Sequence, residues 1–120
     1  MLNKAQIEGL NNKLSKLQVY GIVGEDIGVI QNPVPLQILQ VDPHAEKRMK
    51  QRRITVQDAQ SYIDNAMVMF EQQDGVKRLY VSGDGNSVAV VDGGILITAY
   101  PVSQFDRAMM EILREVKKYV

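Results

Sequence analysis

The sequence has no cysteine, a single histidine and equal numbers of acidic and basic residues, which excludes several classes of site. Without cysteine there is no disulfide, no thiolate nucleophile and no cysteine-based zinc site. A net charge of zero gives the chain no general attraction to nucleic acid or to anionic membranes, so any anion site must be local. Because it has no run of about 18 apolar residues and no secretory-signal core, we expect no membrane segment.

The remaining composition is typical of a globular domain, and the helix and strand patterns described below predict the α+β class. The chain has 120 residues, with an apolar fraction of 45% and a charged fraction of 23%, and is long enough to bury a core. We predict a single domain over residues 1–120. It would consist of an N-terminal helix and loop (1–41), a core that carries the motifs (42–100) and a C-terminal helix (101–120).

Apolar residues at helical spacing predict a first helix over residues 4–17. The segment from residue 18 to residue 41 contains three separated glycines and two prolines, which oppose a regular central strand. We predict a loop or a short edge strand there. Near the other end of the chain, Ser103 and Asp106 offer a capping pair for an amphipathic helix that should pack on the sheet.

Two short helices are predicted in the middle of the chain. Asp42 can cap a helix over residues 43–52, and Pro43 suits its first position. Thr55 and Asp58 resemble a capping box that starts the next helix. The apolar face of that second helix consists of Ala59, Tyr62, Ile63 and Ala66.

From residue 67 the apolar pattern changes from helical to alternating, which predicts a four-stranded antiparallel meander. The strands are expected at about 67–73, 77–82, 86–92 and 95–100, with Asp-Gly turns between them. The alternation places one set of residues on the core face: Leu79, Val81, Val88, Val90, Ile95 and Ile97. It directs Tyr80, Ser82, Thr98 and Tyr100 away from that face, so we expect a second face that is polar and rich in hydroxyl groups.

Metal and nucleotide-cofactor sites are not indicated. Asp74, Asp84 and Asp92 fall at predicted turns, where aspartate forms the hydrogen bonds of the turn itself. No HExxH motif, EF-hand loop, GxGxxG or Walker-type spacing occurs. We therefore expect a function without a metal or a cofactor.

The predicted helix over residues 43–52 carries the chemistry that stands out. Its spacing puts His44, Lys47, Arg48 and either Gln51 or Arg52 on one side, while Ala45 and Met49 mark the side nearer the core. An imidazole is a general acid or base near neutral pH, and arginine stabilises the extra charge of a pentavalent phosphate. Hydroxyl groups of Ser82, Thr98 and Tyr100 are candidates to hold phosphate oxygens.

Simpler interpretations of the same residues stay open. Basic runs are commonly solvated helix faces or partner contacts, and Glu46, Asp58 and Asp64 offer salt bridges that would absorb part of the charge. Tyrosine and threonine are also good strand formers on a half-exposed sheet. A non-catalytic module that docks an acidic protein or RNA, and a phage-associated structural appendage, are therefore alternative hypotheses.

A family resemblance favours the catalytic hypothesis. The segment His44-Ala-Glu-Lys-Arg-Met-Lys-Gln-Arg-Arg-Ile-Thr, followed by Asp58 and by strands that end in Gly94-Ile-Leu-Ile-Thr-Ala-Tyr100, resembles the Barnase–EndoU–colicin–RelE-like superfamily of small ribonucleases. It is similar to toxin domains that begin with a His-Ala-x-x-Arg-Met-x-x-Arg-x-Ile-Thr helix and end with an Ile-Thr-x-Tyr strand. The resemblance covers about residues 42–100, and the first 40 residues and the last helix have no counterpart in it.

By this resemblance, His44, Arg48, Thr98 and Tyr100 are the expected catalytic residues. Supporting phosphate or RNA contacts are expected from Lys47, Arg52, Arg53, Tyr80 and Ser82, with Tyr80 stacking on an unpaired base. The implied function is a metal-independent endoribonuclease toxin that acts on tRNA or another structured RNA in the bacterial cytoplasm. It would be the C-terminal domain of a polymorphic or contact-dependent toxin, with a cognate immunity protein as partner.

Overall fold

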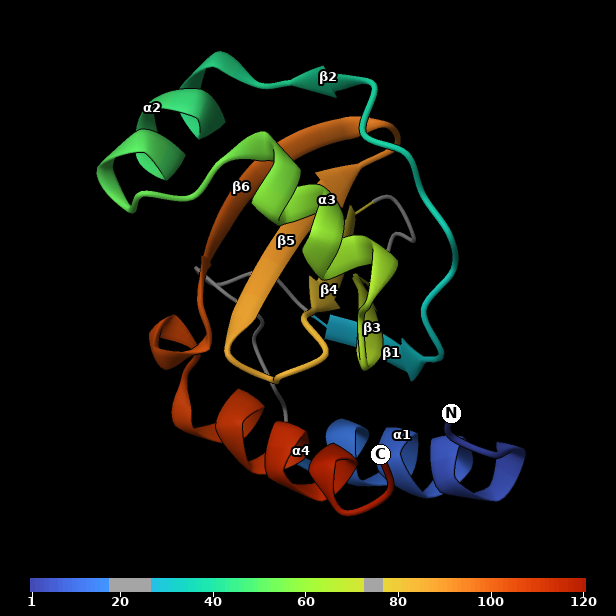
Figure 1. Cartoon of the computed structure of the whole chain (residues 1–120). Coiled ribbons are helices and arrows are strands. Elements are labelled where there is room, and N and C mark those ends of the chain that lie inside the picture. Colours follow the sequence, from blue (N-terminus) through green and yellow to red (C-terminus); the bar gives the residue numbers. More distant parts are fainter. Residues whose placement is uncertain (18–26, 73–76) are drawn as a thin grey trace.

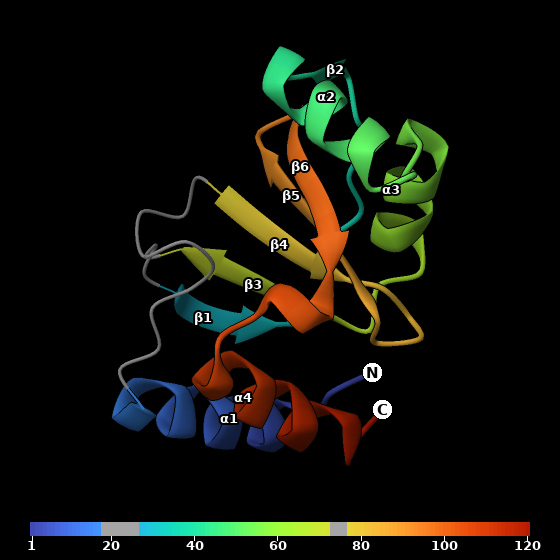
Figure 2. The ribbon, with the colours of Figure 1, turned by 90° about the vertical axis from the view of Figure 1, so that its left-hand side faces the viewer.

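The computed structural model describes residues 1–17, 27–72 and 77–120, which form three layers (Figures 1 and 2). A sheet lies between one pair of helices, α1 and α4, and a second pair, α2 and α3. The helices are α1 (Lys4–Leu17), α2 (Pro43–Gln51), α3 (Val56–Asp64) and α4 (Arg107–Lys117), with a short 3-10 helix η2 (Val102–Gln104). The strands are β1 (Ile27–Gln31), β2 (Gln40–Val41), β3 (Val68–Gln72), β4 (Lys77–Val81), β5 (Ser87–Asp92) and β6 (Ile95–Pro101). In the parts of the chain so described, no helix has both the length and the apolar character needed to cross a membrane.

The sheet has six strands in the order β1-β3-β4-β5-β6-β2, so the prediction of a four-stranded antiparallel sheet was wrong. The four expected strands do form an antiparallel meander from β3 to β6. β1 adds to it antiparallel on one edge, and β2 adds parallel on the other, which makes the sheet mixed. Both additional strands come from the glycine- and proline-containing segment for which only a loop or short edge strand was expected. Part of that segment, residues 18–26, and the Asp74-Gly75 turn lie outside the described residues.

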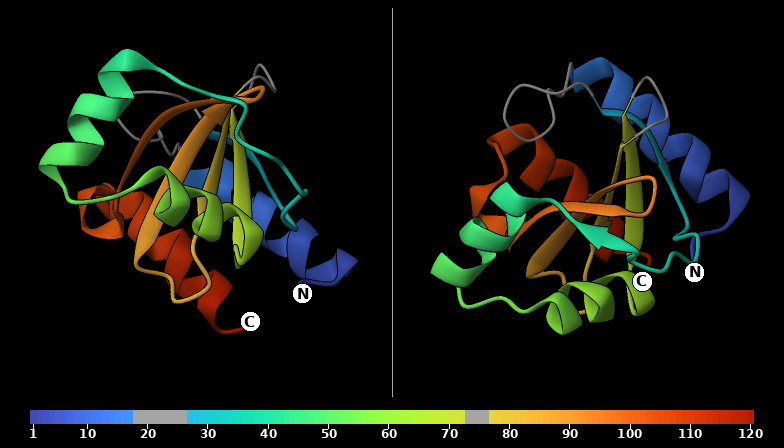
Figure 3. Two further views of the ribbon diagram at one scale, coloured as in Figure 1. Left: turned by 45° about the horizontal axis from the view of Figure 1, so that its top comes forward. Right: turned by 90° about the horizontal axis from the view of Figure 1, so that it is seen from above.

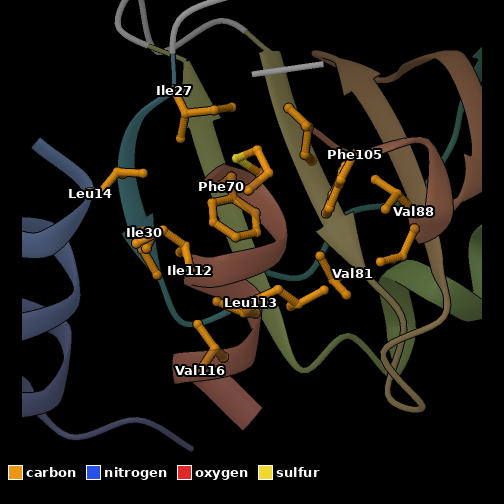
Figure 4. Packing of buried hydrophobic residues seen from close by; sticks show 14 of the residues in the cluster. Leu14, Ile27, Ile30, Phe70, Val81, Val88, Phe105, Ile112, Leu113 and Val116 are labelled. Carbon is orange, nitrogen blue, oxygen red and sulfur yellow. The ribbon is translucent and has the colours of Figure 1, made fainter. Parts of the chain in front are cut away.

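Helices cover both faces of the sheet, so the expected polar face does not exist. The first core lies between the sheet and the α1–α4 pair, where Phe70, Val81 and Val88 of the strands belong to one cluster with Ile112 and Leu113 of α4 (Figure 4). The second core lies under α2 and α3 and consists of Ala45, Met49, Ala59, Ile63, Met69, Tyr80, Ala89, Val91, Leu96 and Ala99. Because both faces are buried, the alternation separates two apolar cores rather than a core from solvent.

A β-bulge in β6 changes which residues of that strand face which core. Val90 lies opposite Thr98, but Val91 lies opposite Leu96, so Ile97 has no partner across the strand pair. As a result Leu96 is fully buried in the second core, whereas Ile95 is 38% exposed. The prediction of Ile95 as a core residue was therefore wrong, and Ile97 is half-buried against the first core.

The helix starts in the middle of the chain were predicted correctly. The side chain of Asp42 accepts a hydrogen bond from the His44 backbone N–H at 2.8 Å, with Pro43 at the first helical position. Thr55 and Asp58 form a reciprocal capping box. Both caps satisfy N–H groups that the first turn of a helix leaves without a partner.

The last helix starts later than predicted. Its N-cap is Asp106, which accepts the Met109 N–H at 2.7 Å, while Ser103 lies in η2. Phe105 is therefore outside the helix, yet it is buried and makes edge contacts with the rings of Phe70 and Tyr100. The expected packing of this helix on the sheet is confirmed.

The side chain of Asn11 in α1 covers the outer edge of β1. Its Nδ2 donates to the Ile30 carbonyl at 3.0 Å, and its Oδ1 accepts the Ile30 N–H at 2.7 Å. Asn32 makes the same reciprocal pair with the Leu2 backbone, at 2.8 and 3.0 Å. The amide of Asn11 thus replaces the strand that an exposed edge would otherwise pair with. This contact makes the N-terminal helix an integral part of the fold.

We expect Asn11→Ala to lower the free energy of unfolding by about 1–2 kcal/mol, because it removes the side-chain partners of two backbone groups. This expected loss already includes the gain of roughly 0.6 kcal/mol that comes from the better helix propensity of alanine. Asn12→Ala is the matched control, because Asn12 is exposed on the same helix, and it should only gain the roughly 0.6 kcal/mol of helix propensity. Urea unfolding measures both variants. Equal effects at the two positions would contradict the edge-capping role.

Candidate functional site

Helix α2 packs against β6, near the β2 edge of the sheet (Figures 1 and 3). Its inner face carries Ala45 and Met49, which are 0% and 2% exposed, as the spacing predicted. His44, Lys47 and Arg48 are exposed. The helix therefore holds its basic residues at the rim of the sheet by burying only two side chains.

The way α2 ends decides between the two arginines that the sequence left ambiguous. The Ile54 N–H donates to the Met49 carbonyl at 2.9 Å, and the Arg53 N–H donates to the Lys50 carbonyl at 3.2 Å. This pair of bonds is a Schellman motif, in which the residue after the cap takes a left-handed conformation. Arg53 is that residue, with φ of 58°, and it is exposed. Arg52 is instead the cap residue and points toward the sheet.

The guanidinium of Arg52 is fixed by three contacts with β6. Its Nη1 donates to Thr98 Oγ1 at 3.1 Å and to the Ala99 carbonyl at 3.0 Å. Its Cζ lies 5.9 Å from the centre of the Tyr100 ring, within the range of a cation–π contact. The three other N–H groups of the guanidinium make no hydrogen bond with the described residues, and so can bind an anion.

Arg52 belongs to the wall of a pocket of about 210 Å³ between α2, the sheet and η2. Its lining consists of Arg48, Arg52, Gln72, Lys77, Leu79, Val90, Ile97, Thr98, Tyr100 and Gln104. The strand residues among them lie on the sheet face of the first core, beyond the part that α4 covers. The structure thus brings together three of the four expected catalytic residues, namely Arg48, Thr98 and Tyr100.

The lining of this pocket is positively charged. It contains three cationic side chains, and no aspartate or glutamate is among the described residues that line it. Asp92, which does not line the pocket, stands opposite Lys77 on the neighbouring strand. Within the described residues, none of the five basic side chains from Lys47 to Arg53 forms an ion pair with a carboxylate. The alternative in which salt bridges absorb this charge is therefore wrong for the part of the chain that the structure describes.

Two of the expected site residues on α2, His44 and Lys47, do not line the pocket. His44 is exposed in the first turn of α2, one helical turn before Arg48, and does not line the cavity. Lys47 lines a shallower hollow between α2 and the start of α3. His44 and Lys47 therefore do not share a cavity with Arg48 and Arg52 in this arrangement.

Tyr80 and Ser82 have structural roles. Tyr80 is completely buried under α2 and α3, on the sheet face opposite to Tyr100, and its hydroxyl donates to the Val34 carbonyl at 2.6 Å. Burial raises the pKa of Tyr80, and Arg78 partly opposes this effect. Ser82 is 5% exposed, and its hydroxyl donates to Asp84 Oδ1 at 2.5 Å in the β4–β5 turn. Neither side chain can contact RNA as expected without opening the fold.

Three polar residues of the pocket were missed by the sequence reasoning. Lys77 is two residues from Leu79 on β4, and Gln72 is two residues from Phe70 on β3. Strict alternation would therefore have placed each on the same sheet face as its apolar neighbour. They were overlooked because each stands at the end of its strand. Gln104 comes from η2, which no pattern in the sequence indicated.

Among the described residues no three histidine, aspartate or glutamate side chains come together in a way that could hold a metal ion. The donors that the pocket offers are guanidinium, ammonium, amide and hydroxyl groups. Such a set is suited to oxygen atoms of an anion.

Comparison of the chain with protein-family models, curated protein sequences and solved structures gives no match. The geometry and charge of the pocket, together with the motif resemblance, are therefore the basis for a functional proposal.

We expect Arg53→Gly to raise the free energy of unfolding by about 0.5–1 kcal/mol, because a left-handed backbone costs an L-residue more than glycine loses in unfolded-state entropy. Arg53→Ala, which removes the same side chain but keeps the strain, is the control and should give no gain. Urea denaturation at an unchanged m-value measures both. Destabilisation by Arg53→Gly would show that the arginine side chain makes a stabilising contact.

The hydrogen bond from Ser82 is the largest cause that lowers the pKa of Asp84, followed by the bond from the Asn86 N–H. We expect Ser82→Ala to raise this pKa toward the ordinary aspartate value. A carboxyl with a lowered pKa contributes stability above its unfolded-state pKa, and this contribution is lost as the pH falls through the folded-state pKa. NMR titration of the Asp84 carboxyl measures the shift, with Ser15→Ala on α1 as the control. An unchanged titration would contradict the structural role of Ser82.

Proposed function

We propose that this chain is a metal-independent endoribonuclease domain whose pocket binds an RNA phosphate. The observation that carries the proposal is the fixed guanidinium of Arg52, which projects beside Arg48 into a cavity without carboxylates among its described lining residues. A preorganised cation stabilises a transition state more than a mobile one does, because it needs no reorganisation as negative charge develops. RNA cleavage by its own 2′-hydroxyl has this requirement, since the phosphate passes through a dianionic pentavalent state.

The chemistry is a transphosphorylation. The 2′-oxygen attacks the adjacent phosphorus and forms a bond to it, the bond from phosphorus to the 5′-oxygen breaks, and a 2′,3′-cyclic phosphate results. One group removes the proton of the 2′-hydroxyl, and another supplies a proton to the departing 5′-oxygen. Arg48 and Arg52 bind the non-bridging oxygens, while Thr98 and Tyr100 hold Arg52 in place.

His44 is the proposed general acid or base. It stands on the same side of α2 as Arg48, at a spacing that makes their side chains neighbours. It is exposed before RNA binds, and catalytic hydrogen bonds often tighten only in the complex with substrate. This position fits a proton-transfer group that meets the ribose or the leaving oxygen at the mouth of the pocket.

The biological setting follows from the motif resemblance. We propose a toxin domain of the polymorphic or contact-dependent type, acting in the bacterial cytoplasm on tRNA or another structured RNA. The cations of α2, which form no ion pair within residues 1–17, 27–72 and 77–120, supply the surface that a cognate immunity protein with acidic side chains would cover.

A non-catalytic RNA-binding module is the second candidate, because His44 does not line the pocket. In that case the same cations would bind the RNA backbone, and no proton-transfer group would be required. The two candidates differ in one product, since only the nuclease generates ends with a cyclic phosphate.

The test is incubation of the purified domain with bacterial tRNA and ribosomal RNA in excess EDTA, followed by denaturing gels and end mapping. We expect cleavage that leaves 2′,3′-cyclic phosphates. His44→Gln should slow it by about 10²–10⁴-fold, as the loss of a general acid or base does. Arg52→Met should slow it by roughly 10²–10³-fold, the effect of losing one preorganised charge donor.

Arg114→Met is the matched control, because this arginine is exposed on α4, and it should cleave like the wild type. Each variant must retain the wild-type melting temperature for the comparison to count. RNA that is bound in an Arg52-dependent way but never cleaved would favour the binding module. Cleavage that survives His44→Gln in full would remove His44 from the mechanism.

A further inference from the structure

The pocket extends across the sheet from α2 toward β3, so it offers more than a phosphate site. Leu79, Val90 and Thr98 stand opposite one another on β4, β5 and β6. With Gln72 on β3, the lining residues span three strand spacings, or about 14 Å. Arg48 and Arg52 occupy the β6 end, which leaves the middle and the β3 end of the pocket to another part of the ligand.

The middle of the pocket is apolar. Leu79 and Val90 are 2% and 6% exposed, and the bulged Ile97 is half-buried beside them. Aliphatic side chains offer nothing to a phosphate, but they suit the flat face of a nucleobase, as the apolar walls of ligand pockets do. The ring of Tyr100 already contacts Arg52, which leaves the aliphatic floor as the surface for a base in this pocket.

A buried amide stands at the end of the pocket away from the arginines. Gln72 is the last residue of β3, is 8% exposed and lines the cavity. A glutamine amide carries two donor and two acceptor positions, so it can contact protein groups and a ligand at the same time. A paired donor and acceptor of this kind reads the edge of a base.

The size of the pocket restricts what it can hold. At about 210 Å³ it is smaller than the roughly 300–1,000 Å³ of pockets that enclose drug-sized ligands. It is therefore suited to one base of a single strand and not to a base pair. Recognition of RNA sequence is generally directed at such unpaired, unstacked bases.

We propose that the pocket holds one unpaired nucleobase on the floor formed by Leu79, Val90 and Ile97, that Gln72 reads an edge of this base, and that Arg48 and Arg52 bind the adjoining phosphate. This inference rests on the RNA substrate proposed above and adds a specificity-determining residue to it. The domain then selects its cleavage position by base identity as well as by RNA shape.

The experiment measures binding separately from cleavage. Fluorescein-labelled 2′-fluoro octamers of A, C, G and U lack the attacking hydroxyl and stay intact, so anisotropy gives their dissociation constants. We expect the wild type to prefer one base by roughly 5- to 150-fold, the effect of one good pair of base contacts. Gln72→Met should bring the four constants within about twofold of each other and leave the salt dependence unchanged.

Three other variants make the result specific. Gln57→Met, at an exposed position of α3, should keep the wild-type preference. Arg52→Met should weaken all four octamers alike and lower the salt slope by about 1, as loss of a phosphate contact does. Ile97→Phe, which fills the floor from a half-buried position, should weaken the preferred octamer by at least about tenfold but leave binding of inorganic tripolyphosphate unchanged.

The outcomes separate this inference from the proposed function. Equal binding of the four octamers by the wild type, with Arg52→Met still weakening it, would overturn the base subsite and leave the RNA function standing. A preference that survives in a folded Gln72→Met would overturn the role of Gln72. Octamers that bind neither the wild type nor the variants would overturn both proposals. Should Gln72→Met fail to fold, Ile97→Phe tests the base subsite instead. Unchanged binding of the preferred octamer by this variant would overturn the subsite, and weaker octamer binding with unchanged tripolyphosphate binding would support it.

Discussion

The contact of Arg52 with β6 is the interaction on which the candidate site depends. It joins the C-terminal end of the basic helix to the Thr98 hydroxyl and the Ala99 carbonyl, and so fixes α2 against the strand that forms the wall of the pocket. A guanidinium suits this position because its planar set of donors can bind the strand on one side and a ligand on the other. Lysine would provide the charge but not this geometry. The C-terminal end of a helix also favours cations by roughly 0.3–1 kcal/mol, so helix stability and the proposed anion site favour the same kind of residue there.

Burial of the sheet on both faces explains why the alternation in the sequence was interpreted wrongly. Tyr80 and Tyr100 were assigned to one polar face, although they face opposite cores. A half-exposed antiparallel strand alternates apolar and polar residues, whereas these strands alternate between two apolar layers and include tyrosines in both. The extra residue at the Ile97 bulge then reverses the alternation within β6, so that residues on its two sides no longer follow one period-two pattern. A period-two pattern cannot show such a shift, because it depends on pairing with a neighbouring strand.

Local signals in the sequence were sufficient wherever a few neighbouring residues determine the structure. The caps at Asp42 and Thr55 and the central meander were all predicted, because each depends on interactions over a few residues. For β1 and β2 the sequence allowed only a loop or one short edge strand, because five- and two-residue strands acquire their structure from the partners that they pair with. The same division applies to the site. Arg48, Thr98 and Tyr100 were predicted, but the choice of Arg52 over Arg53 required the geometry of the helix end.

The exposed position of His44 follows from how α2 is held. The Asp42 cap fixes the first turn, and Arg52 fixes the last, so the pocket forms beside the last turn while His44 stands one turn before Arg48. An RNA strand is longer than a pocket that holds a single base, and its backbone must continue past the rim. In the proposed complex the cations of α2, which have no carboxylate partner among the described residues, would attract that backbone along the exposed face of the helix, which is the face that carries the histidine. The pocket would then set the register of the strand, and the helix would provide the proton-transfer group at the next position along it.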